Sequence, residues 1–411
     1  MDLEDYFVNE KGSNHQLLKQ NNHNLIKKYI YQNSPTSRVE IAHQLGLTTA
    51  TITGMVNPMI SSGLLRETVA PAEGGKGAGR PRMMLEFVPE SYYICGVDVG
   101  VYHTNYVVTD ILGSIVSSKH TEQRLGEYHV TLERLAREIP EFLSKAGIPG
   151  EKILGVGICL PGMIDGSVDK IYDIFHEGWT EHNLCAELGQ RLGLKVEVEN
   201  NVRARAICAE LFDRMVKAEP FAYFFVSFGV ACQMIIDGKV LYGQSAAAGE
   251  IGHTVVQRNG PVCPTCGNRG CLEALTGERA ILQQCRDIMA TDVPTVLREL
   301  CRDPKMLTMD QVLEAQEMGD RAVGSIIADA IEYLGIALAN TINLISPRAV
   351  VLEGRILSTP KNQARMLRTV EQYMFNIHSG MIDFAFLPYD LNRGARAAAA
   401  VVVKEFLGRA I

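Results

Sequence analysis

The chain has 411 residues, 46% of them hydrophobic, with 37 glycines and a formal net charge of −7. This length favours two or three domains, and the composition gives each enough apolar residues for a core. We find no low-complexity segment, no internal repeat and no apolar run that approaches the roughly 18 residues needed to cross a bilayer. Because residues 1–12 are polar and acidic, unlike a signal peptide, and ten cysteines suit a reducing compartment, we expect a cytoplasmic protein without a membrane partner.

Charge is spread unevenly along the chain. Residues 14–88 hold eight Lys or Arg against four Glu, a charge of +4, which leaves −11 on the remainder. A basic segment on an acidic body is typical of a nucleic-acid-binding module joined to a second function. A charge of this size also fits an ordinary solvated surface.

The first part of the chain has the apolar spacing of short helices. The predicted helices lie over residues 15–32, 38–45 and 49–61. Ser37 and Thr48 stand where the second and third helices begin, as capping residues do, and Gly46 lies in the turn between them. Two short helices joined by a glycine turn indicate a helix-turn-helix, whose second helix enters the DNA major groove.

Small hydrogen-bonding side chains mark the expected DNA-facing part of this motif. The helix residues that we expect to contact DNA are Arg38, Thr48, Thr49, Thr51 and Thr53. Pro58 lies further along the third helix, where it should produce a kink beyond the DNA-facing first turns.

Two predicted strands follow, over residues 64–69 and 83–88, and the sequence PAEGGKGAGRPR separates them. A β-hairpin with a glycine-rich basic tip is typical of the wing of a winged helix, which contacts phosphates or the minor groove. From the wing we expect DNA contacts by Lys76, Arg80 and Arg82. A glycine-rich linker is the alternative interpretation of this stretch alone.

From residue 92 onward the pattern changes to strands alternating with helices, which indicates an α/β body. YYICGVDVG opens one strand-rich series, and FAYFFVSFG opens a second, similar series. Predicted helices lie over residues 130–146, 277–288, 294–301, 309–318, 320–342 and 393–408. The repetition predicts two α/β lobes.

A cluster of metal-binding residue types lies in GEIGHTVVQRNGPVCPTCGNRGCLE, residues 249–273. His253, Cys263, Cys266 and Cys271 offer an imidazole and three thiolates within nineteen residues, a plausible tetrahedral ligand set for zinc. Four protein ligands leave no position for a catalytic water, so we expect a structural Zn²⁺. A chance cluster, or redox chemistry at the Cys-x-x-Cys pair, is the alternative.

GEIGH followed by a cysteine cluster that ends in GCLE resembles the signature of the ROK family, which contains sugar kinases and sugar-responsive repressors. Ser37-Arg38 and Gly79-Arg80-Pro81 are similar to the second helix and the wing of the ROK transcriptional regulators. The resemblance starts near residue 14 and covers nearly all of the chain. It implies an N-terminal winged helix followed by an actin-like (ribonuclease H-like), two-lobed sugar-kinase fold.

The resemblance also implies where the domains divide. We expect a winged helix-turn-helix domain over residues 1–89, a first lobe over 90–200 completed by the C-terminal helix 393–411, and a second lobe over 201–392 that carries the zinc loop 249–273.

The motifs with which ROK kinases hold ATP differ here. The first phosphate turn in such kinases resembles Asp-x-Gly-Gly-Thr, whereas residues 98–102 read DVGVY and place a branched side chain and a ring there. The second turn keeps one glycine of four, at Gly229, and Phe228 and Gln233 should crowd a phosphate. The Gly-Gly-Gly of the adenosine side is Glu353-Gly354-Arg355.

The catalytic base of the kinases is also replaced. Their Asp corresponds to Asn201, an amide that can bind a sugar hydroxyl but cannot accept its proton. By resemblance, the effector-binding residues are Asn200, Asn201, Glu250, His253 and Glu273. Amides and carboxylates suit a polyol because each can bridge neighbouring hydroxyls. Support of the zinc loop is the alternative role for the two glutamates.

We therefore expect a regulator without enzyme activity, most simply a repressor, that binds operator DNA and a sugar or sugar-phosphate effector. By resemblance it should act as a homodimer or a dimer of dimers. An active ROK sugar kinase with an appended DNA-binding domain is the alternative, and a DNA-binding scaffold without an effector is a third possibility.

Overall fold

The computed structural model describes residues 15–69, 82–166, 168–173, 178–214, 220–375 and 379–408. The chain divides into two compact units. Unit 1 comprises Met1–Cys159, Asn183–Val198 and Ala395–Ile411, and unit 2 comprises Leu160–His182 and Glu199–Gly394. One boundary between the units falls inside the C-terminal helix, which therefore contributes residues to both.

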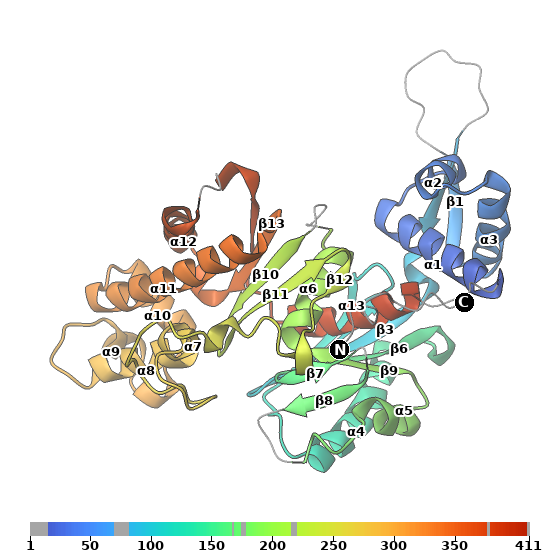
Figure 1. Cartoon of the computed structure of the whole chain (residues 1–411). Coiled ribbons are helices and arrows are strands. Elements are labelled where there is room, and N and C mark those ends of the chain that lie inside the picture. The colour runs from blue at the N-terminus through green and yellow to red at the C-terminus, as the bar shows by residue number, and fades with distance from the viewer. Residues whose placement is uncertain are drawn as a thin grey trace, which may run out of the picture. The chain divides into compact units, whose positions relative to one another are not determined.

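Unit 1 begins with the expected winged helix (Figure 1), built from α1 (His15–Asn33), α2 (Arg38–Leu45), α3 (Thr49–Ser61), β1 (Leu65–Val69) and β2 (Met83–Phe87). The hydroxyl of Ser37 caps α2 by accepting a hydrogen bond from the backbone N–H of Glu40, and Gly46 ends α2 at φ +64°. α3 continues through Pro58, so the proline does not end the helix. The predicted helices and hairpin are thus confirmed, while Lys76 and Arg80 lie outside the described residues.

A five-stranded sheet follows in unit 1, with the strand order β5-β4-β3-β6-β9. Its strands are β3 (Tyr93–Val99), β4 (Thr104–Asp110), β5 (Ile115–Thr121), β6 (Ile153–Leu160) and β9 (Val196–Asn200). β3, β4 and β5 form an antiparallel meander, and β6 pairs parallel to β3. Helices α4 (Tyr128–Ala146), α5 (Leu184–Leu192) and α13 (Arg393–Gly408) accompany the sheet. The sequence alone does not predict α5.

Unit 2 holds a second five-stranded sheet, with the order β12-β11-β10-β13-β14. Its strands are β10 (Phe221–Val226), β11 (Val230–Ile236), β12 (Lys239–Val240), β13 (Ala349–Gly354) and β14 (Asp383–Leu387). The helices of this unit are α6 (Asn201–Leu211), α7 (Leu272–Thr276), α8 (Glu278–Met289), α9 (Leu297–Leu300), α10 (Met309–Glu317), α11 (Arg321–Ile345) and α12 (Pro360–Tyr373). A short hairpin, β7 (Met163–Asp165) and β8 (Lys170–Asp173), completes it.

The two faces of the unit 2 sheet differ in polarity. Ala222, Phe224 and Leu352 lie in a large apolar core with side chains of α7, α8, α11 and α12. Residues of the opposite parity, Tyr223 and Glu353, are buried but polar, and α6 contacts this side of the sheet. Polar residues buried in this way need hydrogen-bond partners inside the protein, and Arg205 of α6 is one such partner of Glu353.

Helix α11 is long and apolar enough, by length and composition alone, to cross a membrane, which the sequence analysis did not anticipate. More than half of its most apolar stretch is buried, and α11 contacts α7, α8, α10 and α12. It is the central helix of the unit 2 core. The sequence alone does not predict α12 either, because PKNQARMLRTVEQY has few apolar residues, although Thr359 caps the helix and Pro360 begins it.

Helix α13 packs directly on the backbone of the unit 1 sheet. A β-carbon on Gly157 would lie 1.9 Å from the carbonyl oxygen of Ala398, and one on Gly96 would lie 2.0 Å from that of Ala395. Neither space can hold a methyl group, so glycine permits the approach of helix to strand. The alanines of α13 in this region are fully buried.

We predict that Gly157→Ala destabilises the protein by about 3 kcal/mol, because α13 has to move away from β6. Gly150→Ala is the matched control, because a β-carbon there meets nothing within 4 Å. Thermal unfolding followed by circular dichroism should show a lower melting temperature for the first variant only. Equal melting temperatures would contradict the close packing of α13.

Candidate functional site

The loop between β12 and α7 folds tightly around its glycines. Gly270 has φ +78°, and a β-carbon there would lie 1.7 Å from the carbonyl oxygen of Gln257. The backbone N–H of Cys263 donates to the carbonyl of Asn268 at 2.7 Å, which closes the turn. This turn brings three cysteines near the short 3-10 helix η5 (Ile251–His253).

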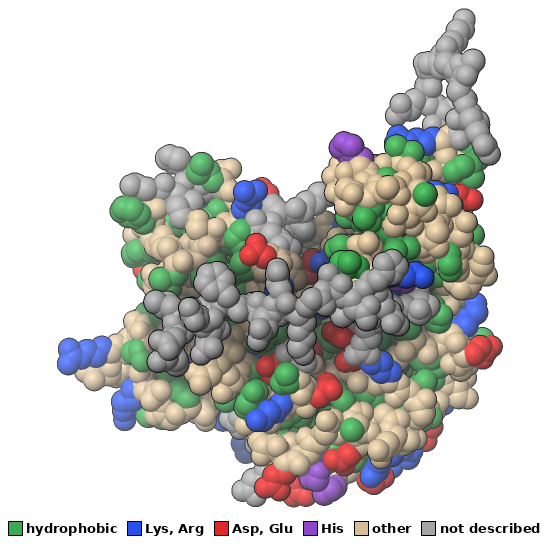
Figure 2. Space-filling view, turned by 45° about the vertical axis from the view of Figure 1, so that its right-hand side comes forward, with side chains coloured by type: hydrophobic (Ala, Val, Ile, Leu, Met, Phe, Trp, Pro, Cys, Tyr) green, Lys and Arg blue, Asp and Glu red, His purple; other side chains and the backbone are tan. Residues whose placement is uncertain are grey.

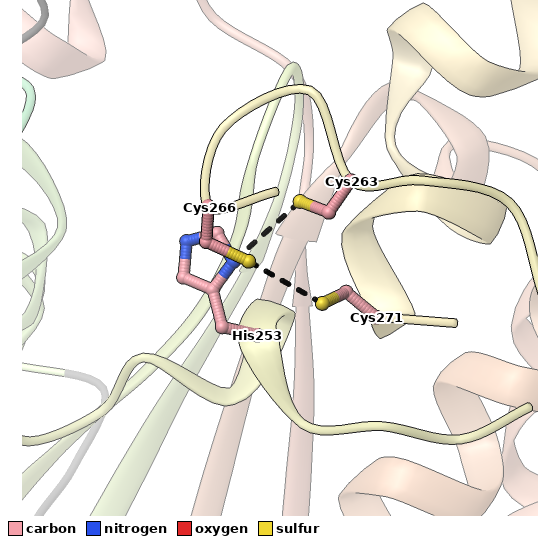
Figure 3. A group of neighbouring side chains, drawn as sticks. All are labelled: His253, Cys263, Cys266 and Cys271. Carbon is pink, nitrogen blue, oxygen red and sulfur yellow. Dashed lines mark hydrogen bonds between the residues drawn. The ribbon is translucent and has the colours of Figure 1, made fainter. Parts of the chain in front are cut away.

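The four predicted metal ligands converge (Figure 3), and one ligand atom from each lies within 4.8 Å of all the others. Sγ of Cys266 lies 3.5 Å from Sγ of Cys271, and Sγ of Cys263 lies 3.8 Å from Nδ1 of His253. Tetrahedral zinc with Zn–S bonds of about 2.3 Å requires sulfur atoms about 3.8 Å apart. The donor set and its spacing therefore fit zinc, and Nδ1 is the imidazole atom that faces the thiols.

The thiols of the cluster differ in acidity. A hydrogen bond from the backbone of Asn268 lowers the pKa of Cys266 to about 7, whereas burial raises the pKa of Cys271 to about 12. A bound divalent cation favours the thiolate form of every coordinating cysteine. In Figure 3 the second ring nitrogen of His253 points away from the sulfur atoms, and with a metal on Nδ1 it would carry the proton.

The two glutamates of the loop have separate surroundings. Glu250 is half-buried, and burial raises the pKa of its carboxyl group, while His253 and Arg203 oppose the shift. Glu273 accepts a 2.5 Å hydrogen bond from the hydroxyl of Thr265. A β-carbon on Gly229 would lie 3.0 Å from Oε2 of Glu273, so this carboxylate covers the turn between β10 and β11.

Asn200 and Asn201 lie at the start of α6, but their side chains are used differently. Oδ1 of Asn200 caps the helix by accepting from the backbone N–H groups of Val202 and Arg203, and Nδ2 donates to the carbonyl of Gly162. Among the described residues Nδ2 makes this one hydrogen bond, which leaves its second hydrogen for a ligand. Asn201 is half-exposed, and no hydrogen bond of its side chain is found among the described residues.

Arg203 is a fully buried residue that the sequence analysis missed. Its guanidinium donates to Oε1 of Glu199 at 2.9 Å and to the carbonyl of Ala246 at 3.2 Å, and it also donates to the carbonyl of Ile164. The hydroxyl of Tyr242 donates to the other oxygen of Glu199 at 2.6 Å. A signal was present in VRARAICAEL, because two arginines in so apolar a helix are unlike a solvated face.

The second phosphate-like turn differs from the expectation in one respect. Phe228 is 38% exposed, in the turn itself. Gln233 is fully buried, and its Nε2 donates to the carbonyl of Ala248 at 2.6 Å, so it lies under the zinc loop rather than at the turn. The expectation that Gln233 crowds this turn is wrong, because β11 directs its side chain toward Ala248 and Gly249.

The first phosphate-like turn is covered by a different ring from the one expected. The imidazole of His103 lies against Gly100, where a β-carbon would meet its Cε1 at 3.0 Å. Tyr102 is 42% exposed and lies below the guanidinium of Arg124. His103 therefore restricts access to the backbone at Gly100, which the spacing of residues 98–102 did not reveal.

The position of the kinase adenosine motif holds a buried ion pair. Glu353 accepts from Nη1 of Arg205 at 2.7 Å and from the hydroxyl of Tyr223. Burial, followed by the charge of Glu353, raises the pKa of Tyr223 well above its usual value, so the phenol stays protonated as the donor. The glutamate at this position is thus a structural link between β13, β10 and α6.

The winged helix presents α3 with its first turn exposed. Thr48 caps α3, and its hydroxyl lies 2.9 Å from that of Thr51. Thr49 is exposed and Thr53 is half-buried, so both lie on accessible parts of the helix. Arg82 is also exposed, at the start of the second wing strand.

Arg38 is less free than its sequence position suggested. Its guanidinium donates to Glu67 and, at 3.2 Å, to Oδ1 of Asn57, an exposed residue of α3 that the sequence does not single out.

On the side shown in Figure 2, the described surface of the winged helix is mostly tan and green, with few blue side chains. Charge on this part of the surface is therefore sparse among the described residues.

Comparison with known sequences gives related regulators. A model of the ROK family matches residues 94–405. The chain is 27% identical over 393 residues to the xylose repressor of Bacillus subtilis (strain 168), covering 95% of this chain and 97% of that repressor. It is 26% identical over 352 residues to the DNA-binding transcriptional dual regulator NagC of Escherichia coli (strain K12) and to the N-acetylglucosamine repressor of Escherichia coli O157:H7, covering 84% of this chain and 83% of each relative.

Solved structures confirm the fold. A crystal structure of a ROK family transcriptional regulator, a homologue of the E. coli Mlc protein, matches with a TM-score of 0.81 and 23% identity, covering 95% of this chain and 97% of that one. A ROK family glucokinase from Streptomyces griseus, solved with glucose and AMPPNP, matches with a TM-score of 0.64 and 22% identity. The glucokinase match covers 75% of this chain and 98% of the glucokinase.

We predict that the protein purified without chelator holds one Zn²⁺ per chain and that Cys266→Ala loses it, because three ligands bind far more weakly than four. Cys185→Ala is the control, since Cys185 lies outside the cluster. Elemental mass spectrometry gives the metal content. In zinc-binding peptides such sites supply about 10–16 kcal/mol of apparent binding energy, so a chelator should lower the melting temperature of the unaltered protein. Metal-free unaltered protein would refute the assignment.

Proposed function

Because the chain belongs to the ROK family, we propose that it is a sugar-responsive transcriptional repressor. Residues 1–89 bind operator DNA, and the two lobes, residues 90–200 with 393–411 and residues 201–392, bind a sugar or sugar-phosphate effector without phosphorylating it. One observation carries the proposal: a helix-turn-helix precedes the α/β body, and Asn201, an amide, begins α6 at the position that by resemblance holds the general base of ROK kinases.

The absence of kinase activity rests on several changes. Loss of a positioned base lowers a reaction rate by about 10²- to 10⁴-fold. His103 lies against Gly100 at the first phosphate-like turn, and Glu353 is buried at the position of the adenosine motif. The change at Asn201 removes the acceptor of the sugar hydroxyl proton, and the other two changes alter the ATP side of the cleft, so together they favour binding without turnover. An active sugar kinase with a DNA-binding domain remains the competing proposal.

The proposed effector site combines Asn201, Glu250, His253 and Glu273, with a smaller contribution from Asn200. Carboxylates accept hydrogen bonds from sugar hydroxyls, whereas the amide and the free imidazole nitrogen can donate. The zinc loop carries three of these residues, so a structural metal would also hold the effector ligands in place. Operator DNA, the effector and a second copy of the chain are the proposed partners, in a cytoplasmic protein without a membrane role.

We predict that Arg82→Ala weakens binding to every DNA duplex and reduces the salt slope by about one, because Arg82 neutralises a phosphate. Thr49→Ala should instead change discrimination between operator sequences, by about 1–3 kcal/mol for a mismatched base pair. Lys305→Ala, an exposed basic residue of unit 2, is the control. Fluorescence anisotropy at several salt concentrations checks all three. A sequence-dependent effect of Arg82→Ala would argue against a phosphate contact.

We predict that D-xylose, N-acetylglucosamine or its 6-phosphate raises the melting temperature, since a ligand that binds only the folded state stabilises it. The same compound should change operator affinity about 5- to 150-fold, the usual range of allosteric coupling. Asn201→Asp alone should not create a kinase. Coupled-enzyme measurement of ATP consumption, with and without the sugar, tests turnover. Sugar phosphorylation at ordinary kinase rates would favour the active-kinase alternative.

A further inference from the structure

We propose that α13 is the element through which ligand binding in unit 2 changes the DNA affinity of the winged helix, α1 to β2, which we call the head. Lys27 and Asp213 are the positioning residues at the two ends of α13. This inference rests on the proposed function, since it names how that function is regulated. The inference goes beyond the proposed function because it assigns roles to residues outside both the effector site and the DNA-facing helix. Three groups of contacts along α13 support it.

The carboxyl end of α13 is held by the first helix of the head. Lys27 is fully buried, and its Nζ donates to the carbonyl of Phe406 at 2.5 Å and lies 4.3 Å from the centre of the Phe406 ring. Nδ2 of Asn24 donates to the carbonyl of Gly408 at 2.6 Å. The last carbonyls of a helix lack partners within it and carry its partial negative charge, so a cation and an amide from α1 complete this terminus.

The amine of Lys27 is a costly choice for this position. Burial lowers the pKa of Lys27 to about 8, because an apolar surrounding disfavours the charged form of the amine. A methionine would fill the same space without that cost. The hydrogen bond of Lys27 therefore fixes where α1 contacts the end of α13, which an apolar side chain of the same size would not do.

The middle of α13 cannot move freely across its sheet. It lies against the backbone at Gly96 and Gly157, and Nε of Arg396 donates to the carbonyl of Gly113 at 2.7 Å. The same loop contacts the head, because the hydroxyl of Tyr31 donates to the carbonyl of Ile111 at 2.8 Å. The head, this loop and the latter part of α13 are thus joined within unit 1.

The amino end of α13 belongs to unit 2 and is tied to the end of α6. Nη1 of Arg393 donates to Oδ2 of Asp213 at 2.7 Å, and both side chains are largely buried. Asp213 lies two residues beyond the end of α6, and α6 starts at Asn201 of the proposed effector site. A ligand at the start of α6 and a head held at the end of α13 are therefore connected through one buried ion pair and two helices.

The first test uses the full chain and a duplex that the unaltered protein selects from a random library. Asp213→Asn should change operator affinity about threefold without any sugar, although Asp213 belongs to a different unit from the head. Asp292→Asn, an exposed residue of unit 2, is the control and should leave affinity unchanged. Zinc content and melting temperature are measured for both variants. Unchanged affinity in Asp213→Asn would overturn the proposal.

The second test uses whichever of D-xylose, N-acetylglucosamine or its 6-phosphate raises the melting temperature of the unaltered protein. Lys27→Met should keep this thermal shift, but the change in operator affinity caused by the sugar should fall to less than twofold. Lys19→Met, an exposed lysine of the same helix, should respond like the unaltered protein. Asn24→Ala offers a milder change at the same contact, should Lys27→Met fold poorly.

The outcomes separate the two proposals. A full sugar response in both Lys27→Met and Asn24→Ala would overturn the role of α13 while leaving the repressor function intact. If no sugar affects the unaltered protein but Asp213→Asn still changes operator affinity, the connection through α13 holds and the sugar-sensing function fails.

Discussion

The burial of Arg203 is the constraint on which the proposed effector site depends. A guanidinium cannot lose its charge inside a protein, so its donors must find partners wherever the chain places it. Here those partners come from β9, from the β7–β8 hairpin and from the loop before Gly249, three segments that are distant in sequence. Removing one member of such a buried pair typically costs about 3–5 kcal/mol, because the remaining charge has no partner. The hydrogen bonds of Arg203 therefore hold these three segments together beside the proposed effector site.

The same fold occurs in a ROK transcriptional regulator and in a ROK glucokinase, and in this chain several positions of the proposed site hold side chains unlike those expected of a kinase. Asn201 begins α6, a ring lies against Gly100 and Glu353 is buried, within a fold that matches the S. griseus glucokinase over 75% of this chain. Glu353 has instead become part of an ion pair that joins two strands to α6. A body of this kind retains the shape of an enzyme and the polar groups suited to a hydroxylated ligand.

The sequence predicted those parts of the molecule that local rules determine. Capping residues such as Ser37 and Thr48 located the helices of the winged helix, and the spacing of one His and three Cys located the metal cluster. Contacts between distant segments were not predictable in this way. Nothing near Lys27 in the sequence indicates Phe406, and the alternation of β11 alone did not show that Gln233 turns toward Ala248. α12 was missed because its few apolar residues acquire a core only from α11.

The close contact of α13 with Gly96 and Gly157 has a genetic consequence. Every amino-acid change that a single-base mutation can make in a glycine codon introduces a side chain. At these two positions even the smallest side chain overlaps the backbone of α13. Alanine should therefore destabilise the protein at either position, and the larger side chains that other single-base mutations introduce should prevent folding more often. A selection for constitutive expression of the regulated genes would recover such alleles at residues remote from both the DNA and the ligand.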